Sequence, residues 1–313
     1  MTAVDASEPA IATDGDARLA ALLAGCTPEE REVLADMVET SRRHGSDFDL
    51  VQLVHHNMKA DLYSALSTDY EELLAIAAPP MFKTYTDVPK VALPEAADLD
   101  HSLDAVIRAR ASRRDFGSGA LTLAEIATLL HYTCGVKKHI LAYNRRDFPV
   151  RFQPNAGGLQ SFETYLVVNR VEGLARGVYH FAPDENVLDL VDRGNFRVRL
   201  TSSCLHQEWV SHAGAVLVFT TVPGRLMWKY GPRSYRYAHV DVGIATGAAY
   251  LIATALKLRA CAVSGFMDSQ VDDIVGIDGR TEFTQLLFAV GTRPGRRTPG
   301  ANDDVAPSAD PTG

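Results

Sequence analysis

The sequence has few cysteines and no long run of uncharged apolar residues. Its four cysteines lie far apart and form no C-x-x-C pair, so neither a zinc site nor a disulfide framework is supported. The longest such apolar run, residues 242–256, covers about 15 residues, short of the roughly 18 that a membrane span needs. The acidic amino terminus lacks the basic start and apolar stretch of a signal peptide. We therefore expect a metal-free, cytoplasmic protein that does not enter a membrane.

Positive charge is also in short supply. The formal net charge of −8 argues against nucleic acid as a partner, because binding phosphates needs a basic surface. What is present is ordinary for a globular protein: 313 residues, of which 46% are hydrophobic and 22% charged. A chain of this length and composition can bury a sizeable core.

The chain is predicted to have four parts. Residues 1–20 and 295–313 are rich in Ala, Asp, Gly and Pro and read as flexible tails. A helix is expected from Thr27 and Pro28, opening a helical region over residues 21–94 that could serve docking or dimerisation. Its last part is an extended connector punctuated by proline. Residues 95–294 would form the main domain.

Helices and strands interleave in this main domain without strict alternation. Caps at Ser102 and Thr122 predict two helices before the first strand. A long apolar helix is expected over residues 237–258, and a short one capped by Asp268 or Ser269. The predicted strands are residues 162–169, 178–181, 187–191, 215–221, 260–264 and 282–290. Because residues 178–191 read as a hairpin, an α+β fold with a mostly antiparallel sheet is expected.

Arginine and serine side chains alternate at the end of the first of these helices. In Arg110-Ala111-Ser112-Arg113-Arg114, alternate positions of an extended segment point the same way. Guanidinium groups bind phosphate through paired hydrogen bonds, so Arg110, Ser112 and Arg114 make a candidate phosphate clamp. The alternative is a solvated, basic helix end.

A turn of small residues directly precedes the strand predicted at 162–169. Pro154-Asn155-Ala156-Gly157 would let the backbone approach a flat ring closely. It lacks the G-x-G-x-x-G spacing of a dinucleotide site, and a bare turn is the alternative.

The segment Trp228-Lys229-Tyr230-Gly231-Pro232-Arg233 is predicted to be an aromatic and cationic loop. A lysine beside a tyrosine can turn the phenol into a usable proton acceptor in a dry pocket. Surface packing of cations on aromatic rings is the alternative. His239-x-Asp241 could be a fragment of a metal site, but no third ligand lies nearby in the sequence.

Together these elements resemble the nitroreductase superfamily. That superfamily has an R-x-S-x-R element, a P-S-A-G type turn and a G-F element after a long helix, and this sequence has Ser264-Gly265-Phe266 in the third place. The W-K-Y-G-x-R form of residues 228–233 is similar to the SagB-type dehydrogenases, whose azoline-oxidising members carry a Lys-Tyr pair. Asn155 and Ala111 depart from the usual Ser and Arg.

The resemblance implies FMN as cofactor. Its binding residues would be Arg110, Ser112, Arg114, Pro154, Asn155, Ala156, Gly157, Ser264, Gly265 and Arg293. It also implies that Lys229 and Tyr230 transfer a proton, and that the protein is a homodimer with the flavin at the subunit interface.

The reaction so implied is the oxidation of thiazolines or oxazolines to thiazoles or oxazoles in a ribosomally made peptide. The azoline-containing precursor peptide and a cyclodehydratase of the YcaO type would be the partners. Two alternatives stay open: a flavin reductase of the same fold that uses NAD(P)H on dehydroamino acids, nitro compounds or quinones, and a scaffold without flavin.

Overall fold

The structure is a computed structural model that describes residues 79–296 without a gap. It also describes six residues nearer the amino terminus: Pro28, Arg31, Glu32, Val54, His55 and Met58. The chain divides into two compact units, residues 1–62 and 63–313. Of the helix predicted from Thr27, Pro28, Arg31 and Glu32 are helical. The two predicted tails, except residues 295–296, and most of the predicted helical region lie outside the described residues.

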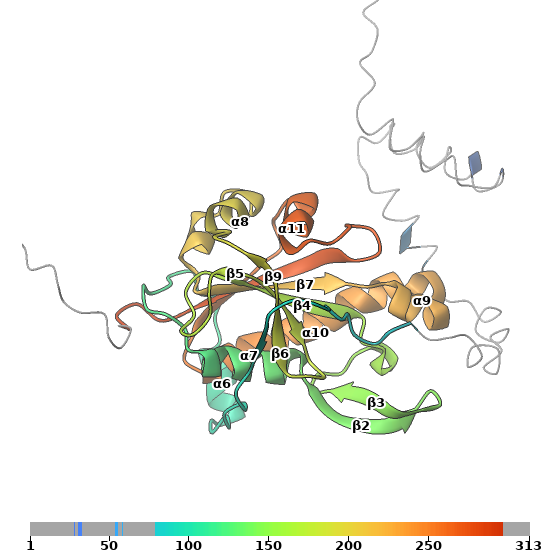
Figure 1. The fold of residues 1–313 in the computed structure, drawn as a ribbon, viewed down its shortest axis with the longest axis horizontal. Helices are drawn as coiled ribbons and strands as arrows, with labels where there is room; N and C mark the ends of the chain where they lie inside the picture. Colours follow the sequence, from blue (N-terminus) through green and yellow to red (C-terminus); the bar gives the residue numbers. More distant parts are fainter. Residues whose placement is uncertain (1–27, 29–30, 33–53, 56–57, 59–78, 297–313) are drawn as a thin grey trace, which may run out of the picture. The chain divides into compact units, whose positions relative to one another are not determined.

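An antiparallel sheet of seven strands forms the centre of the second unit (Figure 1). Its order is β1-β6-β5-β4-β7-β9-β8, and every neighbouring pair runs antiparallel. In chain order the strands are β1 Lys90–Ala92, β4 Phe162–Val168, β5 Gly177–Ala182, β6 Val187–Arg193, β7 Ala215–Thr221, β8 Arg259–Val263 and β9 Phe283–Gly291. The predicted α+β class and antiparallel sheet are confirmed.

Helices cover both faces of this sheet (Figure 1). One face carries α6 Leu103–Ala109, α7 Leu123–Cys134 and α10 Ser234–Ala255, and the other carries α8 Arg197–Ser203 and α11 Asp268–Val275. Successive strand residues alternate between two cores: Leu166 and Leu217 pack under α7 and α10, while Val167 and Val218 pack under α8 and α11. Both sides of β4 and β7 are therefore buried, which explains their continuous apolar sequences.

The predicted helix caps at Ser102 and Thr122 are confirmed. Ser102 accepts a hydrogen bond from the backbone N–H of Ala105, and Thr122 forms a reciprocal capping box with Glu125. The short helix α11 instead has Met267 at its cap position, so the predicted cap at Asp268 or Ser269 is wrong by one or two residues.

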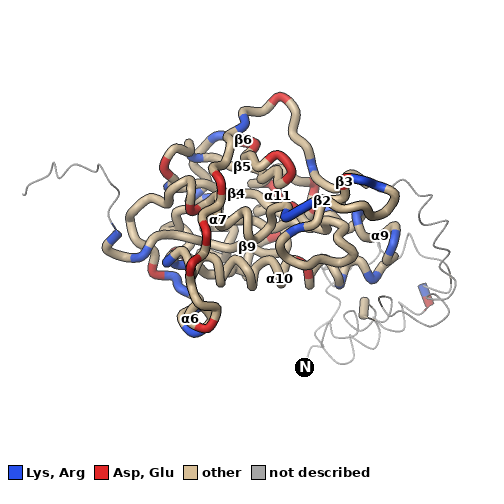
Figure 2. Tube along the Cα trace, turned by 90° about the horizontal axis from the view of Figure 1, so that it is seen from below, with Lys and Arg blue, Asp and Glu red and all other residues tan. Residues whose placement is uncertain are grey.

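The prediction that two helices come before the first strand is wrong, because strands lie both before and after α6 and α7. β1 lies in the connector and pairs with β6. After α7 comes a separate hairpin of β2 Val136–Ala142 and β3 Arg145–Arg151. Its outer strand β2 is exposed and basic (Figure 2), so it has none of the apolar alternation by which strands are predicted. Lysines on an exposed edge also oppose pairing with another chain.

The predicted aromatic and cationic loop is mostly helical, which is a second correction. It comprises α9 Gly224–Tyr230 and a short 3-10 turn, Gly231–Arg233, and α10 then starts at Ser234 rather than at Tyr237. Within the described residues one helical stretch, Gly224–Ala255, is long and apolar enough to cross a membrane, but just over half of its apolar window is buried inside the protein. It packs as a core helix.

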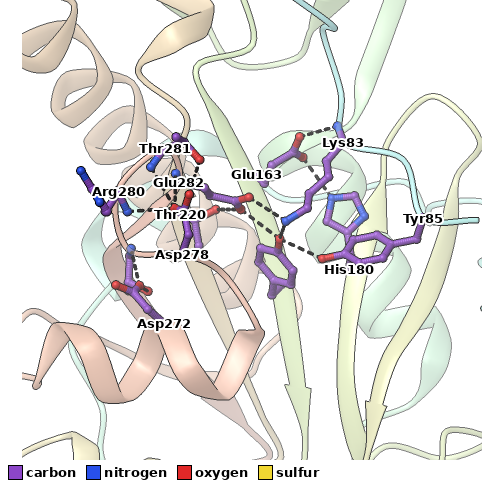
Figure 3. A network of polar contacts seen from close by, with 12 residues as sticks. Lys83, Tyr85, Glu163, His180, Thr220, Asp272, Asp278, Arg280, Thr281 and Glu282 are labelled. Atoms are coloured by element: carbon purple, nitrogen blue, oxygen red, sulfur yellow. Dashed lines mark hydrogen bonds and ion pairs between the residues drawn. The ribbon is translucent and has the colours of Figure 1, made fainter.

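A buried polar network fastens the connector to the sheet (Figure 3). The backbone N–H of Lys83 donates to Glu163, and its ammonium donates to Glu282 and to the Tyr165 hydroxyl, at 2.6, 2.7 and 2.8 Å. Glu163 also contacts Arg225 at 2.5 Å and His180 at 3.1 Å. Burial disfavours the carboxylate, but Arg225 and His180 outweigh it and lower the pKa of Glu163 to about 2. The network thus keeps a buried charge paired.

Candidate active site

The arginine-serine segment runs along the free edge of the sheet. Helix α6 ends at Ala109, and the extended residues that follow lie beside β8, where the N–H of Arg113 donates to the carbonyl of Ala260 at 2.7 Å. The Ser112 hydroxyl lies 3.0 Å from the hydroxyl of Tyr250, and the guanidinium of Arg110 lies over the same ring. Tyr250 of α10 thus brings Arg110 and Ser112 together.

Arg114 takes a different direction from these two side chains. Its guanidinium lies 5.4 Å from the ring centre of Trp209. Arg110, Ser112 and Arg114 are all exposed, and within the described residues neither arginine forms an ion pair. Their positive charges are therefore available to an anion.

Ser264, Gly265 and Arg293 lie close to the same edge of the sheet. Ser264 and Gly265 directly follow β8, and the Gly265 carbonyl accepts a hydrogen bond from Gln207 at 3.0 Å. Arg293 follows β9 and donates to the carbonyl of Lys257, just beyond α10, at 2.8 Å. Because Gly291 pairs with Arg259, the exposed Arg293 lies at the opposite end of β8 from Ser264 and Gly265.

The carboxylate of Asp241, in the amino-terminal half of α10, fixes the turn at residues 154–157. Asp241 accepts from the backbone N–H of Ala156 at 2.9 Å and from the Ser161 hydroxyl at 2.6 Å. Burial raises the pKa of Asp241, although these hydrogen bonds oppose the shift. From the sequence, His239-x-Asp241 is interpreted as a helix-start pair with local hydrogen bonds rather than as a fragment of a metal site, but the Asp241 partners Ala156 and Ser161 are distant in the chain. The described residues contain no group of three potential metal ligands.

Three polar groups converge on Gly157. Gly157 has a φ of 60°, and a Cβ atom there would lie 2.6 Å from the Tyr230 hydroxyl, 3.0 Å from the Tyr143 hydroxyl and 3.4 Å from the Lys229 ammonium. Only glycine fits this position without displacing them. The structure thus brings together the predicted turn and the predicted Lys-Tyr pair, 72 and more residues apart in the chain.

A cavity of about 350 Å³ opens beside this cluster. Pro154, Asn155, Ala156, Tyr230, Tyr237 and Asp241 are among its lining residues. The amide nitrogen of Asn155 is buried and has no hydrogen-bond partner. Because an unpaired buried donor costs free energy, this nitrogen is suited to a ligand acceptor.

Within one chain the predicted cofactor residues fall into two groups. We call Arg110, Ser112, Ser264, Gly265 and Arg293 the edge group, and Pro154–Gly157 with Lys229 and Tyr230 the turn group. Arg114, whose guanidinium lies over Trp209, belongs to neither group. Tyr250 and Asp241 anchor them to α10 nine residues apart, which is about 13 Å along the axis and two and a half turns around it. The two anchors thus hold the edge group and the turn group at separate places along α10.

Comparisons with known proteins agree on a family. The nitroreductase family model matches residues 107–292. A candidate nitroreductase of Methanocaldococcus jannaschii is 30% identical over 66% of this chain and 98% of its own length. The crystal structure of a candidate nitroreductase from Anabaena variabilis is 30% identical, with a TM-score of 0.56, over 66% of this chain and 42% of that one.

A further similar structure is a chain of the Escherichia coli microcin synthetase McbBCD complex with truncated pro-MccB17 bound. The likeness covers 74% of this chain and 97% of that one, with a TM-score of 0.50 and 22% identity. At this identity the two chains share the fold.

Proposed function

Because the chain belongs to the nitroreductase family of oxidoreductases, whose members typically bind flavin, we propose that it is an FMN-dependent azoline dehydrogenase. Its substrate would be a ribosomally made peptide carrying thiazolines or oxazolines, which it oxidises to thiazoles or oxazoles. The observation that carries the proposal is the convergence of Lys229 and Tyr230 on the small-residue turn at Gly157.

The residues of this chain fit FMN. The edge group offers exposed guanidinium groups and a serine hydroxyl, which are the donors that a phosphate prefers. The turn group offers the unpaired amide of Asn155 beside a cavity, and a glycine surface at which polar atoms meet. Arg110, Ser112, Arg114 and Arg293 would hold the phosphate end, with Ser264 and Gly265 beside them. Residues 154–157 would border the ring.

When bound, FMN would supply the two-electron acceptor that a dehydrogenation needs. The protein's own task is then to remove a proton from the azoline ring. Tyr230 has its hydroxyl at the turn, next to the ammonium group of Lys229, which is half-buried. Burial disfavours the ammonium, but the hydrogen bond to Tyr143 and the tyrosines nearby raise the pKa of Lys229. A charged Lys229 would stabilise the phenolate form of Tyr230, which would accept the proton from the azoline ring and so become the neutral phenol.

A peptide substrate is supported by the similar fold of a chain in the microcin synthetase complex, whose structure contains a bound precursor peptide. Azolines in such peptides must first be made from Cys, Ser or Thr side chains. We therefore propose a cyclodehydratase of the YcaO type as the partner that supplies the substrate.

A homodimer would complete the site. The edge and turn groups are held at separate places along α10 in one chain, and in the proposed homodimer a second copy would bring its own turn group to the edge group. Helix α10 also exposes Gly243 and Gly247, one turn apart, and a Cβ at either position would meet no atom within 4 Å. Such positions allow a second helix to approach closely.

Two other functions are weighed against this one. The family name favours a flavin reductase that uses NAD(P)H on nitro compounds, quinones or dehydroamino acids. A flavin-free scaffold would keep the fold and lose the cofactor, and purified protein that stays colourless after addition of FMN would support it. Consumption of NAD(P)H with no azoline oxidation would support the reductase.

The proposal is tested with Lys229→Ala and Tyr230→Phe. Both variants should bind FMN as the wild type does, yet lose roughly a hundredfold or more of their azoline oxidation, the usual contribution of acid–base groups. Lys138→Ala and Tyr132→Phe are matched controls, since Lys138 is an exposed hairpin residue and Tyr132 a half-buried ring on α7. Unchanged turnover in both Lys229→Ala and Tyr230→Phe would contradict the proposed role of these residues in proton transfer.

A further inference from the structure

Tyr143 occupies an unusual backbone position at the tip of the β2–β3 hairpin. It and Asn144 form the two-residue turn, with φ angles of 50° and 58°. Turns of this kind favour asparagine and glycine, and a bulky aromatic residue at positive φ is unfavourable. Strained residues persist where surrounding contacts hold them, and they gather at functional sites. Contacts of the Tyr143 side chain must therefore stabilise this unfavourable backbone conformation.

Its hydroxyl joins the hairpin to both parts of the turn group. Lys229 donates from its ammonium to the Tyr143 hydroxyl at 2.5 Å, and that hydroxyl donates to the carbonyl of Gly157 at 3.0 Å. The ammonium also lies 4.6 Å from the centre of the Tyr143 ring. Because its proton is directed to Gly157, the Tyr143 oxygen presents a lone pair to Lys229.

The ring itself is packed where it stands. It contacts Phe148 of the same hairpin and the edge of Trp228 of α9, with ring centres 5.0 and 5.9 Å away. It belongs to a small apolar cluster that also includes Leu226 and Tyr230. The hairpin thus holds the Tyr143 hydroxyl rigidly beside the Lys229 ammonium.

We infer that Tyr143 is a positioning residue of the active site, which holds the Lys229 ammonium beside the Tyr230 hydroxyl. This inference rests on the proposed role of Lys229 and Tyr230 in proton transfer. Among the described residues, only Tyr143 and Tyr230 offer a hydrogen-bond acceptor to the flexible Lys229 side chain, so without the Tyr143 hydroxyl only Tyr230 is left. Its ammonium would then spend less time at the distance at which it stabilises the Tyr230 oxygen.

The charged and titratable groups around Lys229 come from three elements. Tyr143 faces it from the hairpin and Tyr230 from α9, while α10 contributes Tyr237 and Asp241 to the adjoining cavity. Burial disfavours the ammonium, but the hydrogen bond to Tyr143 and the tyrosines nearby outweigh it and raise the pKa of Lys229. Removing that hydrogen bond should let Lys229 lose its proton at a lower pH than in the wild type.

The test is Tyr143→Phe in the full-length protein, which keeps the packed ring and removes only the hydroxyl. With ¹³Cε-labelled lysine, the NMR resonance of Lys229, assigned by its absence in Lys229→Ala, should titrate at lower pH in the variant than in the wild type. With FMN and an azoline peptide, kcat should fall by roughly tenfold or more while KM changes little, and the alkaline limb of the kcat profile should move to lower pH. Tyr132→Phe should match the wild type in each measurement.

An unchanged Lys229 titration in Tyr143→Phe would overturn the inference, as would an unchanged kcat and pH profile in an enzyme that oxidises azolines. If the wild type with FMN leaves the azoline peptide unaltered, the proposed function fails instead. The NMR titration still decides whether Tyr143 sets the state of Lys229, so the two failures are distinguishable.

Discussion

At the scale of single residues, Asp241 shows how a buried carboxylate shapes the site without touching the reaction. It accepts hydrogen bonds from Ala156 and Ser161 and so sets the path of the turn. The turn then places Gly157 where Lys229, Tyr230 and Tyr143 meet. The geometry of the proposed flavin edge thus depends on one side chain of α10.

Replacing Asp241 with alanine should loosen the turn. The N–H of Ala156 and the hydroxyl of Ser161 would lose their acceptor, at a cost of about 1–3 kcal/mol for each buried group. We expect FMN to bind roughly tenfold or more weakly, as measured by flavin fluorescence titration. Asp273→Ala, on the exposed side of α11, is the control. Equal FMN affinity in Asp241→Ala and the wild type would contradict the role of Asp241.

Residues within a local motif were predictable, and those joined across the chain were not. Lys229, Tyr230 and Pro154–Gly157 each stand in a short pattern with a chemical meaning. Asp241 and Tyr143 act through partners 85 and 86 positions away, and nothing in their own neighbourhoods indicates those contacts. Positive φ at Tyr143 is likewise set by the hairpin, which the sequence did not reveal.

At the scale of elements, apolar periodicity decides what can be predicted. β4 and β7 are buried on both faces and were found within one residue of their ends. β2 is basic and exposed, and β1 has three residues, so neither carries enough apolar pattern. The segment Trp228–Tyr230 is the end of a short helix, α9, although its aromatic and charged side chains predict a loop.

The network between the connector and the sheet gives this part of the molecule a pH-dependent stability. Glu163 has a lowered pKa, so its contribution is present above about pH 4.3 and is lost as the pH falls toward 2. Burial disfavours charge on His180, but Asp189 and Glu163 outweigh it and raise its pKa. The His180 contribution is therefore present below about pH 6.5 and is lost as the pH rises through the raised pKa.

Glu163→Gln should destabilise the protein by roughly 3–5 kcal/mol, because it leaves Arg225 buried without its charged partner and His180 with only Asp189. Urea unfolding at several pH values measures this difference, which should be largest between about pH 4.5 and 6.5 and shrink in stronger acid. Glu185→Gln, which removes an exposed ion pair with Lys90, should cost about 1 kcal/mol or less. A difference that stays constant as the pH falls to about 2 would contradict the account.

At the scale of the whole molecule, the family resemblance gave the fold class, and the structure added what a motif cannot contain. The strand order β1-β6-β5-β4-β7-β9-β8 and the placement of the edge and turn groups follow from packing between distant segments. In the proposed homodimer, dimer formation and flavin binding would depend on each other, because α10 faces from two copies would border each flavin.

Gly247→Arg tests this coupling. The position is open in one chain, so the variant should fold, but the long side chain would keep a second α10 from approaching. We expect a monomer with little bound FMN, as measured by light scattering and flavin absorbance. Val198→Arg, an exposed residue of α8 on the other face of the sheet, should remain dimeric and yellow. If Gly247→Arg stays dimeric and yellow, this face of α10 is not the dimer interface.

The most direct test of the proposed function is the mass of an azoline-containing peptide after incubation in air with the FMN-loaded wild-type protein. The account predicts the loss of two hydrogen atoms for each azoline ring, with Lys229→Ala leaving the mass almost unchanged. A wild-type protein that carries FMN and still leaves every azoline ring unoxidised would contradict it.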